Sequence, residues 1–229
     1  LTHSFNDESQ ILKIKYKGVV KLIRINLIGK IQIKNILMAL IAAEKSGLNL
    51  NKILNVLPSL KPIEGRFEKI GMIKNKSKVV LDYAHTPDAL KTCLLNLKEQ
   101  FPDKKIILLF GCGGNRDQNK RSKMGKIADI FSDEIYLTDD NPRFESSHKI
   151  RKDIRTGIKK TKVIEISDRG KAIARAIKNL TTGEILLVAG KGHEKVQDIG
   201  KRKIFFSDKK IILNSIKIKN VALSSNFKL

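Results

Sequence analysis

The sequence predicts an α/β domain built on a mostly parallel sheet with helices on both faces. Short runs rich in Val, Ile and Leu alternate with amphipathic segments of helical period along most of the chain. These runs are near-continuous in apolar residues, as expected of strands that are buried on both faces and joined by right-handed helical crossovers. We therefore predict strands at residues 79–83, 106–110, 135–138, 163–166 and 185–189, and helices at residues 87–100, 120–131, 147–160 and 169–180.

A smaller unit precedes this pattern. Residues 11–28 have the β-type pattern of a hairpin that is broken at Lys17 and Gly18. Helical spacing of apolar residues then begins at Ile31, and Gly47 is placed to end that helix. A second short helix is expected at residues 50–57, before Pro58.

The segment 57–67 is typical of a domain boundary, because it carries two prolines and a glycine between apolar anchors. We expect one unit at residues 1–62 and a second at residues 63–229.

Capping signals define the first helix of the second unit. Thr86 can accept a hydrogen bond at the N-cap, Pro87 suits the first helical position, and Asp88 suits the positive end of the helix dipole. Near the end of the chain, residues 205–206 predict an edge strand and residues 208–218 a last helix.

Composition limits the classes of function. With 229 residues, of which 41% are hydrophobic, the chain is long enough to bury a core. The formal charge of +23 is spread along the chain as 36 lysines against 10 arginines, and aromatic residues are only 5%. A lysine-coated surface is therefore favoured over a nucleic-acid-binding groove, which would cluster its cations and interleave aromatic residues.

Other classes lack their signals in this sequence. Cys93 and Cys112 share no metal-type spacing, which argues against a zinc site or a disulfide framework and favours a reducing cytoplasm. No apolar run approaches the ~20 residues that span a bilayer, so no stable membrane insertion is expected. The first residue is Leu1, and we expect the chain to begin inside a longer protein.

Polar sequences follow four of the predicted strands. In open α/β sheets, ligands bind outside the carboxyl ends of the strands. Because these loops would meet at one edge, while the amino ends of the strands are unremarkable, the pattern predicts a binding site there. The loops are DYAHTPD at residues 82–88, GCGGNRD at 111–117, TDDNPR at 138–143 and AGKGHE at 189–194.

Taken singly, the first two loops also fit ordinary structure. A dinucleotide-binding G-x-G-x-x-G would need glycine at position 116, where the chain has Arg116, so a glycine turn that projects this arginine over the edge is the better interpretation. His85 is placed to contact a phosphate, or equally to bond to local backbone. Asp82, His85 and His193 match no metal-ligand spacing.

The other two loops carry charges of both signs. Pro142 stiffens the path into Arg143, whose planar fork pairs with a carboxylate in a way that lysine cannot match. Asp139 or Asp140 could accept from an ammonium group, and Glu194 could hold a second cation or cap a helix. Each loop could be an exposed turn, but Arg116, Arg143 and Glu194 together suit a ligand that bears carboxylate and ammonium groups.

Five separated stretches, in order and spacing, closely resemble the C-terminal domain of the Mur ligases. They are GRFEKI at 65–70, LDYAHTPDAL at 81–90, LFGCGGNRDQNKRSKMGKIA at 109–128, TDDNPR at 138–143 and VAGKGHEKVQ at 188–197. LIGKIQIKNILMALIAA, at 27–43, resembles the end of the family's central ATP-binding domain. The resemblance implies a Rossmann-like C-terminal domain at residues 63–229, preceded at residues 1–62 by the tail of that central α/β domain.

The resemblance is to the members that add meso-diaminopimelate to UDP-MurNAc-L-Ala-D-Glu in peptidoglycan biosynthesis. In that family, ATP phosphorylates a carboxylate and the amine of the incoming amino acid attacks the acyl phosphate. The residues implied to bind diaminopimelate are Arg116, Asp140, Asn141, Pro142, Arg143, Gly190 and Glu194. Those implied to face ATP are Asn35, Arg66, Asp82 and His85.

No G-x-x-x-x-G-K-[ST] phosphate loop occurs in the sequence, so we expect no catalytic residue in this fragment and no activity from it alone. The ligands of Mg²⁺ are expected upstream, with no metal site in this chain. A cytoplasmic monomer that binds no nucleic acid is implied. The alternatives are a related ligase that adds L-lysine, a non-catalytic basic domain that binds polyanions, and a degenerate ligase domain used only for interaction.

Overall fold

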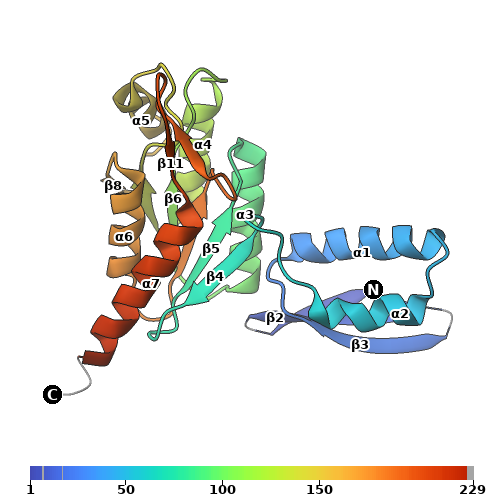
Figure 1. Ribbon diagram of the computed structural model, residues 1–229. Coiled ribbons are helices and arrows are strands. Elements are labelled where there is room, and N and C mark those ends of the chain that lie inside the picture. The colour runs from blue at the N-terminus through green and yellow to red at the C-terminus, as the bar shows by residue number, and fades with distance from the viewer. Residues whose placement is uncertain (7, 17, 226–229) are drawn as a thin grey trace.

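The computed structural model describes residues 1–6, 8–16 and 18–225, and it has two parts (Figure 1). The first is an antiparallel sheet in the order β1-β2-β3 with two helices against it. The predicted hairpin is observed as β2 and β3, although Lys17 lies outside the described residues. The elements are β1 (Thr2–Asn6), β2 (Ser9–Tyr16), β3 (Val19–Ile25), α1 (Lys30–Lys45), α2 (Leu50–Val56) and the 3₁₀ turn η1 (Leu57–Ser59).

Both helices of this first unit lie where the sequence predicts them. Gly47 has a φ of 88° after α1, a backbone conformation that glycine adopts without a Cβ penalty. The side chain of Asn49 caps α2 by accepting from the amides of Asn51 and Lys52. The sheet and helices enclose a small separate core.

The second part is a six-stranded sheet in the order β4-β5-β9-β6-β7-β8, in which every neighbouring pair is parallel except β4 with β5. The predicted mostly parallel sheet is therefore confirmed. Sequence reasoning missed β4, because this edge strand is only partly buried and lacks a continuous apolar run. The strands are β4 (Glu68–Met72), β5 (Lys78–Asp82), β6 (Ile106–Phe110), β7 (Glu134–Leu137), β8 (Lys162–Glu165) and β9 (Ile185–Ala189).

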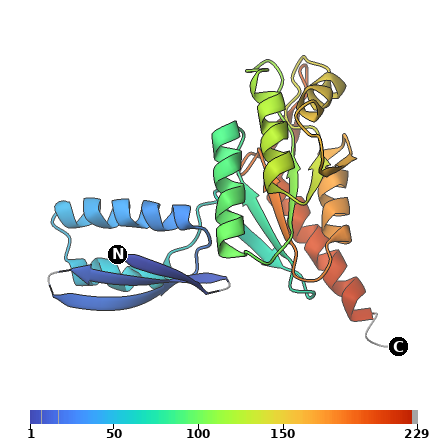
Figure 2. The same ribbon diagram turned by 180° about the vertical axis from the view of Figure 1, so that it is seen from behind.

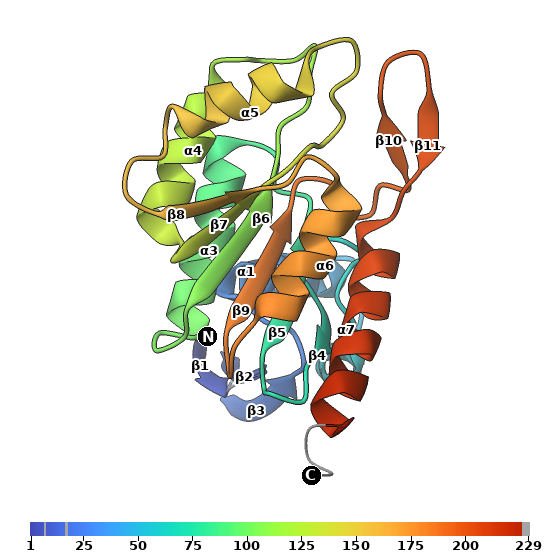
Figure 3. The ribbon, with the colours of Figure 1, turned by 90° about the vertical axis from the view of Figure 1, so that its left-hand side faces the viewer.

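Helices cover both faces of this sheet (Figures 2 and 3). Alternate residues of each strand point to opposite faces, so that Val80 belongs to the core shared with α3, α4 and α5, while Val79 and Leu81 belong to the core shared with α6 and α7. Thr86 caps α3 by accepting from the Ala89 amide at 3.3 Å, as predicted. The helices are α3 (Pro87–Gln100), α4 (Lys120–Phe131), α5 (Ser147–Arg155), α6 (Arg169–Asn179) and α7 (Asp208–Ser225).

Two details of the expected layout were wrong. α5 ends at Arg155 rather than at residue 160, because Gly157 packs directly against the backbone of α4 and the chain then turns to place the Thr161 amide on Asp129. Residues 205–206 do not add an edge to the main sheet. Instead, β11 (Lys203–Phe205) pairs with β10 (Val196–Asp198) in a separate ribbon that projects beside the carboxyl ends of the strands (Figure 3).

Side-chain amides of α3 join the two parts. Gln100 Oε1 accepts from the Gly29 amide at 2.8 Å, and Asn96 Oδ1 accepts from the Ile31 amide at 2.9 Å. The start of α1 is therefore held against α3 (Figure 1). Measured against the length and apolarity that crossing a bilayer requires, every helix in the described ranges falls short. Both cysteines are buried and free.

Candidate functional site

Four loops meet at the carboxyl edge of the main sheet. The order β5-β9-β6-β7 places residues 190–195, which follow β9, between the loops that follow β5 and β6. The loops also touch directly: Gly192 packs on Tyr83, and Gly114 donates from its amide to Asn141 O at 2.9 Å. The convergence predicted from the sequence is observed.

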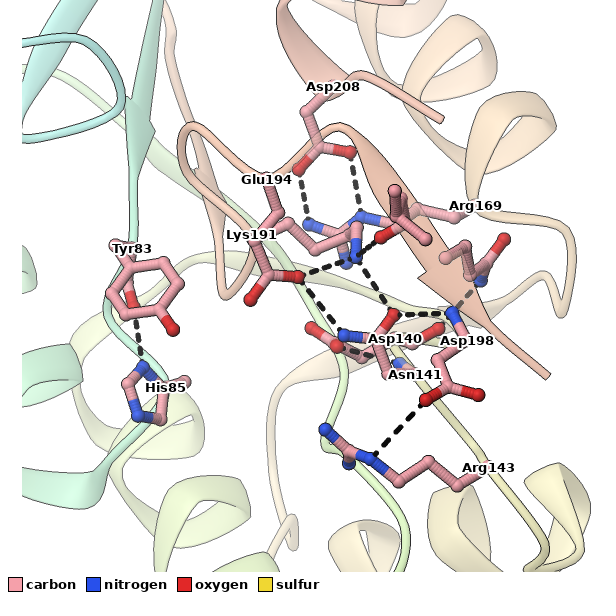
Figure 4. A network of polar contacts seen from close by, with 12 residues as sticks. Tyr83, His85, Asp140, Asn141, Arg143, Arg169, Lys191, Glu194, Asp198 and Asp208 are labelled. Carbon is pink, nitrogen blue, oxygen red and sulfur yellow. Dashed lines mark hydrogen bonds and ion pairs between the residues drawn. The ribbon is translucent and has the colours of Figure 1, made fainter. Parts of the chain in front are cut away.

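A buried polar network lies at the centre of this edge (Figure 4). Lys191 Nζ donates to Asn141 Oδ1 at 2.9 Å, to Glu194 Oε2 at 2.8 Å and to Val196 O at 2.7 Å. Asn141 Nδ2 donates to the same Glu194 oxygen at 3.0 Å, and Asn141 Oδ1 also accepts from the Asp198 amide at 3.0 Å. Two of the predicted ligand-binding residues, Asn141 and Glu194, are thus held in one cluster.

The environment of Glu194 keeps its carboxyl group ionised. Burial works to raise its pKa, but the hydrogen bond and charge of Lys191 and the hydrogen bond of Asn141 outweigh that effect and lower the pKa below its usual value. The side chain is 31% exposed, so the carboxylate is open to a ligand. An ionised, partly exposed carboxylate suits an ammonium group.

Asp140 lies beside Glu194 and above a second buried cation. Its Oδ1 accepts from the Asn141 amide at 2.6 Å, and a Cβ added at Gly190 would lie only 2.8 Å from its Oδ2. Because Gly190 also has a φ of 117°, no other residue fits there without moving this carboxylate. The second buried cation is Arg169, which is fully buried and donates to Ala189 O at 3.0 Å.

Arg143 is fixed at the other side of the network. Its Nη1 donates to Gly114 O at 2.7 Å, its Nε lies 3.8 Å from Asp198 Oδ2, and its backbone amide donates to Asp198 O at 3.0 Å. Its φ of 52° is rare for a residue with a side chain, and these contacts hold it there. Among the described residues, the Nη2 group has no hydrogen-bond partner, so one edge of the fork is open to a carboxylate.

Arg116 lies on the loop after β6 and is exposed, with no ion pair or hydrogen bond to any described residue. It is the one predicted diaminopimelate-binding side chain that the protein itself does not position. Pro142 O accepts from the Glu145 amide at 3.0 Å, which closes the turn after Arg143. Asp139, left open beside Asp140 by the sequence, is instead paired with Arg151.

Two of the four residues predicted to face a nucleotide, Arg66 and His85, lie together beside this network. The Arg66 guanidinium lies over the Tyr83 ring, 4.5 Å from its centroid, and the His85 ring meets Tyr83 edge-on at 4.6 Å. Arg66 and His85 are exposed. Figure 4 shows Tyr83 and His85 together on one side of the network, and the Tyr83 side chain also hydrogen-bonds to Glu194, so the two groups share this residue.

Asp82 has a role that sequence reasoning missed. Its Oδ2 accepts from the Phe67 amide and its Oδ1 from the Ala84 amide, both at 2.7 Å. The carboxylate is buried and joins the segment at residues 65–67 to the end of β5. Its contact with a ribose remains a prediction.

Asn35 lies apart from the carboxyl edge, on the exposed side of α1. It lines a largely apolar groove of about 530 Å³ between α1, α2 and residues 57–63. One turn earlier, Gln32 Nε2 donates to Arg66 O at 3.2 Å, so α1 contacts the backbone of the nucleotide-facing group.

Several functional residues were not singled out from the sequence. Lys191 and Tyr83 sit inside quoted motifs, and a lysine between two glycines after a buried strand was the available signal for the first. Arg121 gave no signal, because its partners are distant in sequence. It is fully buried in α4 and bonds to Glu145 at 2.8 Å and to Asp153 at 2.9 Å, which fixes the loop after Arg143.

Comparison with known proteins gives consistent results. Residues 65–192 match the family described as Mur ligase, glutamate ligase domain. A UDP-N-acetylmuramoyl-L-alanyl-D-glutamate–2,6-diaminopimelate ligase of Rickettsia felis is 42% identical over 198 residues, which are 86% of this chain and 37% of that protein. The chain therefore spans about two fifths of the length of that relative.

Two solved structures extend the comparison. A structure of a UDP-N-acetylmuramoyl-L-alanyl-D-glutamate–2,6-diaminopimelate ligase is similar with a TM-score of 0.73 and 32% identity, over 95% of this chain and 45% of that one. The MurF ligase from Thermotoga maritima in complex with ADP is similar with a TM-score of 0.65 over 97% of this chain and 46% of that one. At 18% identity the second shows a shared fold alone.

Proposed function

From the premise that this chain belongs to the Mur ligase family, we propose that it is the amino-acid-binding part of a ligase that adds meso-diaminopimelate to UDP-MurNAc-L-Ala-D-Glu. The observation that carries the proposal is the placing of Arg143 and Glu194 at the two sides of one buried network. One presents an open guanidinium edge and the other an ionised carboxylate.

The charges of the site suit the far end of diaminopimelate, which carries one ammonium and one carboxylate. Glu194, with the carbonyl of Gly190, would hold the ammonium group. Arg143 would pair with the carboxylate, assisted by the exposed Arg116 and by the second Nδ2 hydrogen of Asn141. Lysine lacks this carboxylate, so its binding would leave the open edge of the partly buried Arg143 fork unpaired, which is a source of selectivity.

We propose residues 1–62 as the tail of the central ATP-binding domain and residues 63–229 as the C-terminal domain. Support comes from the apolar surface of the first unit. Leu22 and Met38, two large apolar side chains of this unit, are each 71% exposed. In the proposal, further parts of the ligase cover them.

ATP, when bound, supplies the phosphoryl group that activates the substrate carboxylate. The residues present fit part of such a site: the exposed Arg66 and His85 flank the Tyr83 ring, and Lys120 Nζ donates to His85 O at 2.8 Å. We propose that Arg66 and His85 face the ribose and phosphates and that Asn35 faces the adenine. No group of three or more potential metal-binding side chains occurs in the ranges that the structure describes, and the proposal places the Mg²⁺ ligands in the remaining part of the family's length.

In this proposal the chain's own residues act by positioning. Holding the amine of diaminopimelate against an activated carboxylate lowers the entropic part of the activation free energy. This effect reaches roughly 7–11 kcal/mol in well-oriented systems. The network at the sheet edge would fix the far end of the amino acid while the ribbon β10–β11 covers one side. We also propose a cytoplasmic location and a monomeric state, which sedimentation of the purified chain would check.

Calorimetric titration of the 229-residue chain with meso-diaminopimelate and with L-lysine tests the proposal. We expect diaminopimelate to bind at least about tenfold more tightly, because lysine would forgo a charge-assisted hydrogen bond to the partly buried Arg143, which is worth about 1.4 kcal/mol or more. Arg143→Lys should remove most of that difference, because an ammonium cannot reproduce the bidentate fork. Arg155→Lys, an exposed arginine on α5, is the matched control and should change nothing.

Equal affinity for the two amino acids would remove the selectivity argument. Absence of any diaminopimelate binding, with tight and salt-sensitive binding of a polyanion instead, would replace the proposal with a polyanion-binding domain.

A further inference from the structure

Lys191 is a fully buried cation at the centre of the site, and no ligand can reach it. Its Nζ has three hydrogens and three acceptors within 2.9 Å, contributed by the loop after β7, its own loop and β10. We propose that Lys191 is a positioning residue that orients Glu194 and Asn141 and keeps the site selective for the distal ammonium of the amino acid. The inference rests on the proposed function for the identity of the ligand.

The contacts of Lys191 determine which way Asn141 faces. Asn141 Oδ1 accepts from two donors, Lys191 Nζ and the Asp198 amide, at 2.9 and 3.0 Å. A flipped amide would place its NH₂ group against both of them, at the cost of two buried hydrogen bonds. Lys191 therefore fixes Nδ2 toward Glu194 and toward the ligand.

The same contacts divide the carboxylate of Glu194 into two unlike oxygens. Oε2 accepts from Lys191 at 2.8 Å and from Asn141 at 3.0 Å. Oε1 accepts from neither of them and lies on the part of the carboxylate that a ligand shares with the Tyr83 side chain, which also hydrogen-bonds to Glu194. Without Lys191, Oε2 would keep only the single hydrogen bond from Asn141, and the carboxylate could rotate.

Lys191 also sets the charge that Glu194 presents. The titratable and charged groups that face Glu194 are Lys191 from its own loop, Tyr83 after β5, Asp140 after β7 and Arg169 from α6. Burial raises the pKa of Glu194, and Lys191 is the first group that opposes it. With Lys191 neutralised, burial would favour the protonated form, which has no charge to attract an ammonium group.

Three variants separate this role from a general effect on folding. Lys191→Met removes the charge and the hydrogen bonds, whereas Lys191→Gln removes the charge but keeps an NH₂ donor with two hydrogens on a side chain that is shorter by one atom. Lys195→Met is the matched control, because Lys195 lies on the same segment and is exposed. If Lys191→Met fails to fold, Lys191→Gln carries the test.

The first measurement needs no ligand. The ¹³C chemical shift of the Glu194 carboxyl group, followed against pH, should show a pKa that rises by at least about one pH unit in both Lys191 variants and stays in place in Lys195→Met. An unchanged Glu194 titration in a folded Lys191→Gln protein would overturn the inference, whatever the ligand proves to be.

The second measurement is the affinity for meso-diaminopimelate as a function of pH. Because an ammonium ligand needs the ionised carboxylate, affinity is lost as pH falls through the Glu194 pKa. In the Lys191 variants this loss should begin at higher pH. Near neutrality the lost orientation of Glu194 and Asn141 should also reduce the affinity about tenfold. A Glu194 shift without any diaminopimelate binding in the unmodified chain would support the positioning role and defeat the proposed function, so the two failures are distinguishable.

Discussion

The ion pair between Arg169 and Asp208 supports the site from the interior of the domain. Its burial and hydrogen bonds set the loss of stability that its removal should cause. Both side chains are fully buried. Arg169 donates from Nε at 2.8 Å and from Nη2 at 2.7 Å to the two carboxylate oxygens, and from Nη2 to Ala189 O at 3.0 Å. Arg169→Met leaves a buried carboxylate without its partner, which costs about 3–5 kcal/mol. For a domain of this size the melting temperature should fall on the order of 10 °C.

The double variant separates the pair from its surroundings. Replacing Arg169 by Met and Asp208 by Leu together removes both charges, so only the lost bond to Ala189 O should remain, at a cost of about 1–3 kcal/mol. The single losses therefore should not add, and a double-mutant cycle should show a coupling of several kcal/mol.

Urea unfolding followed by circular dichroism measures these free energies of unfolding. Lys30→Met is the control, since Lys30 pairs with Glu99 at 3.1 Å with both side chains largely exposed, and exposed pairs contribute about 0–1 kcal/mol. If Arg169→Met costs no more than Lys30→Met, the buried pair does not stabilise this edge of the sheet and the reasoning fails.

Individual contacts give three further predictions. Backbone hydrogen bonds, chiefly from Thr161, outweigh burial and lower the pKa of Asp129 to about 2. The Asp129 carboxylate therefore stabilises the fold above its unfolded pKa of about 4, and this contribution is lost as pH falls toward the folded value. In urea titrations the stability deficit of Asp129→Asn should shrink as pH falls from about 5 to about 2, and a deficit independent of pH would contradict this. Burial raises the pKa of Cys112 to about 12 and that of Cys93 further, so neither thiol should react with a disulfide reagent until the domain unfolds; rapid reaction of the native protein would be the opposing result. A Cβ at Gly113 would lie 2.9 Å from Arg143 Nη1, so Gly113→Ala should displace the Arg143 guanidinium. The affinity for meso-diaminopimelate, measured by calorimetry, should then fall about tenfold while the affinity for lysine is unaffected. An equal loss of affinity for both amino acids would instead indicate a collapsed loop.

The parts of the fold that follow from local signals could be predicted. Buried strands appear in the sequence as continuous apolar runs, and both β6 and β9 have the predicted bounds. The cap at Thr86 depends only on residues within one helical turn, so it too was available from the sequence. Parallel strands place their carboxyl ends at one edge, which is why the four loops could be grouped from the strand pattern alone.

Strand order and long-range partners could not be predicted in the same way. Nothing in the sequence places β9 between β5 and β6, although that order brings the loop with Lys191 into the centre of the site. Arg169 and Asp208 are 39 positions apart and occupy the starts of two helices, where each alone has the appearance of an ordinary surface charge. Ribbon β10–β11 was misassigned, because a short pattern of apolar residues does not say which strand it pairs with.

The excess of positive charge on this chain and the chemistry of its site are separate properties. Inside the site every buried cation has an acidic partner: Lys191 has Glu194 and Arg169 has Asp208, while Arg143 lies near Asp198. A groove built for phosphate chains would leave such cations open along its length. Here the network presents the open edge of the Arg143 guanidinium together with the partly exposed, ionised carboxylate of Glu194, so groups of both signs are available to a ligand. The proposed ligand, a small zwitterion, matches charges of both signs better than a polyanion would, even on a surface coated with lysine.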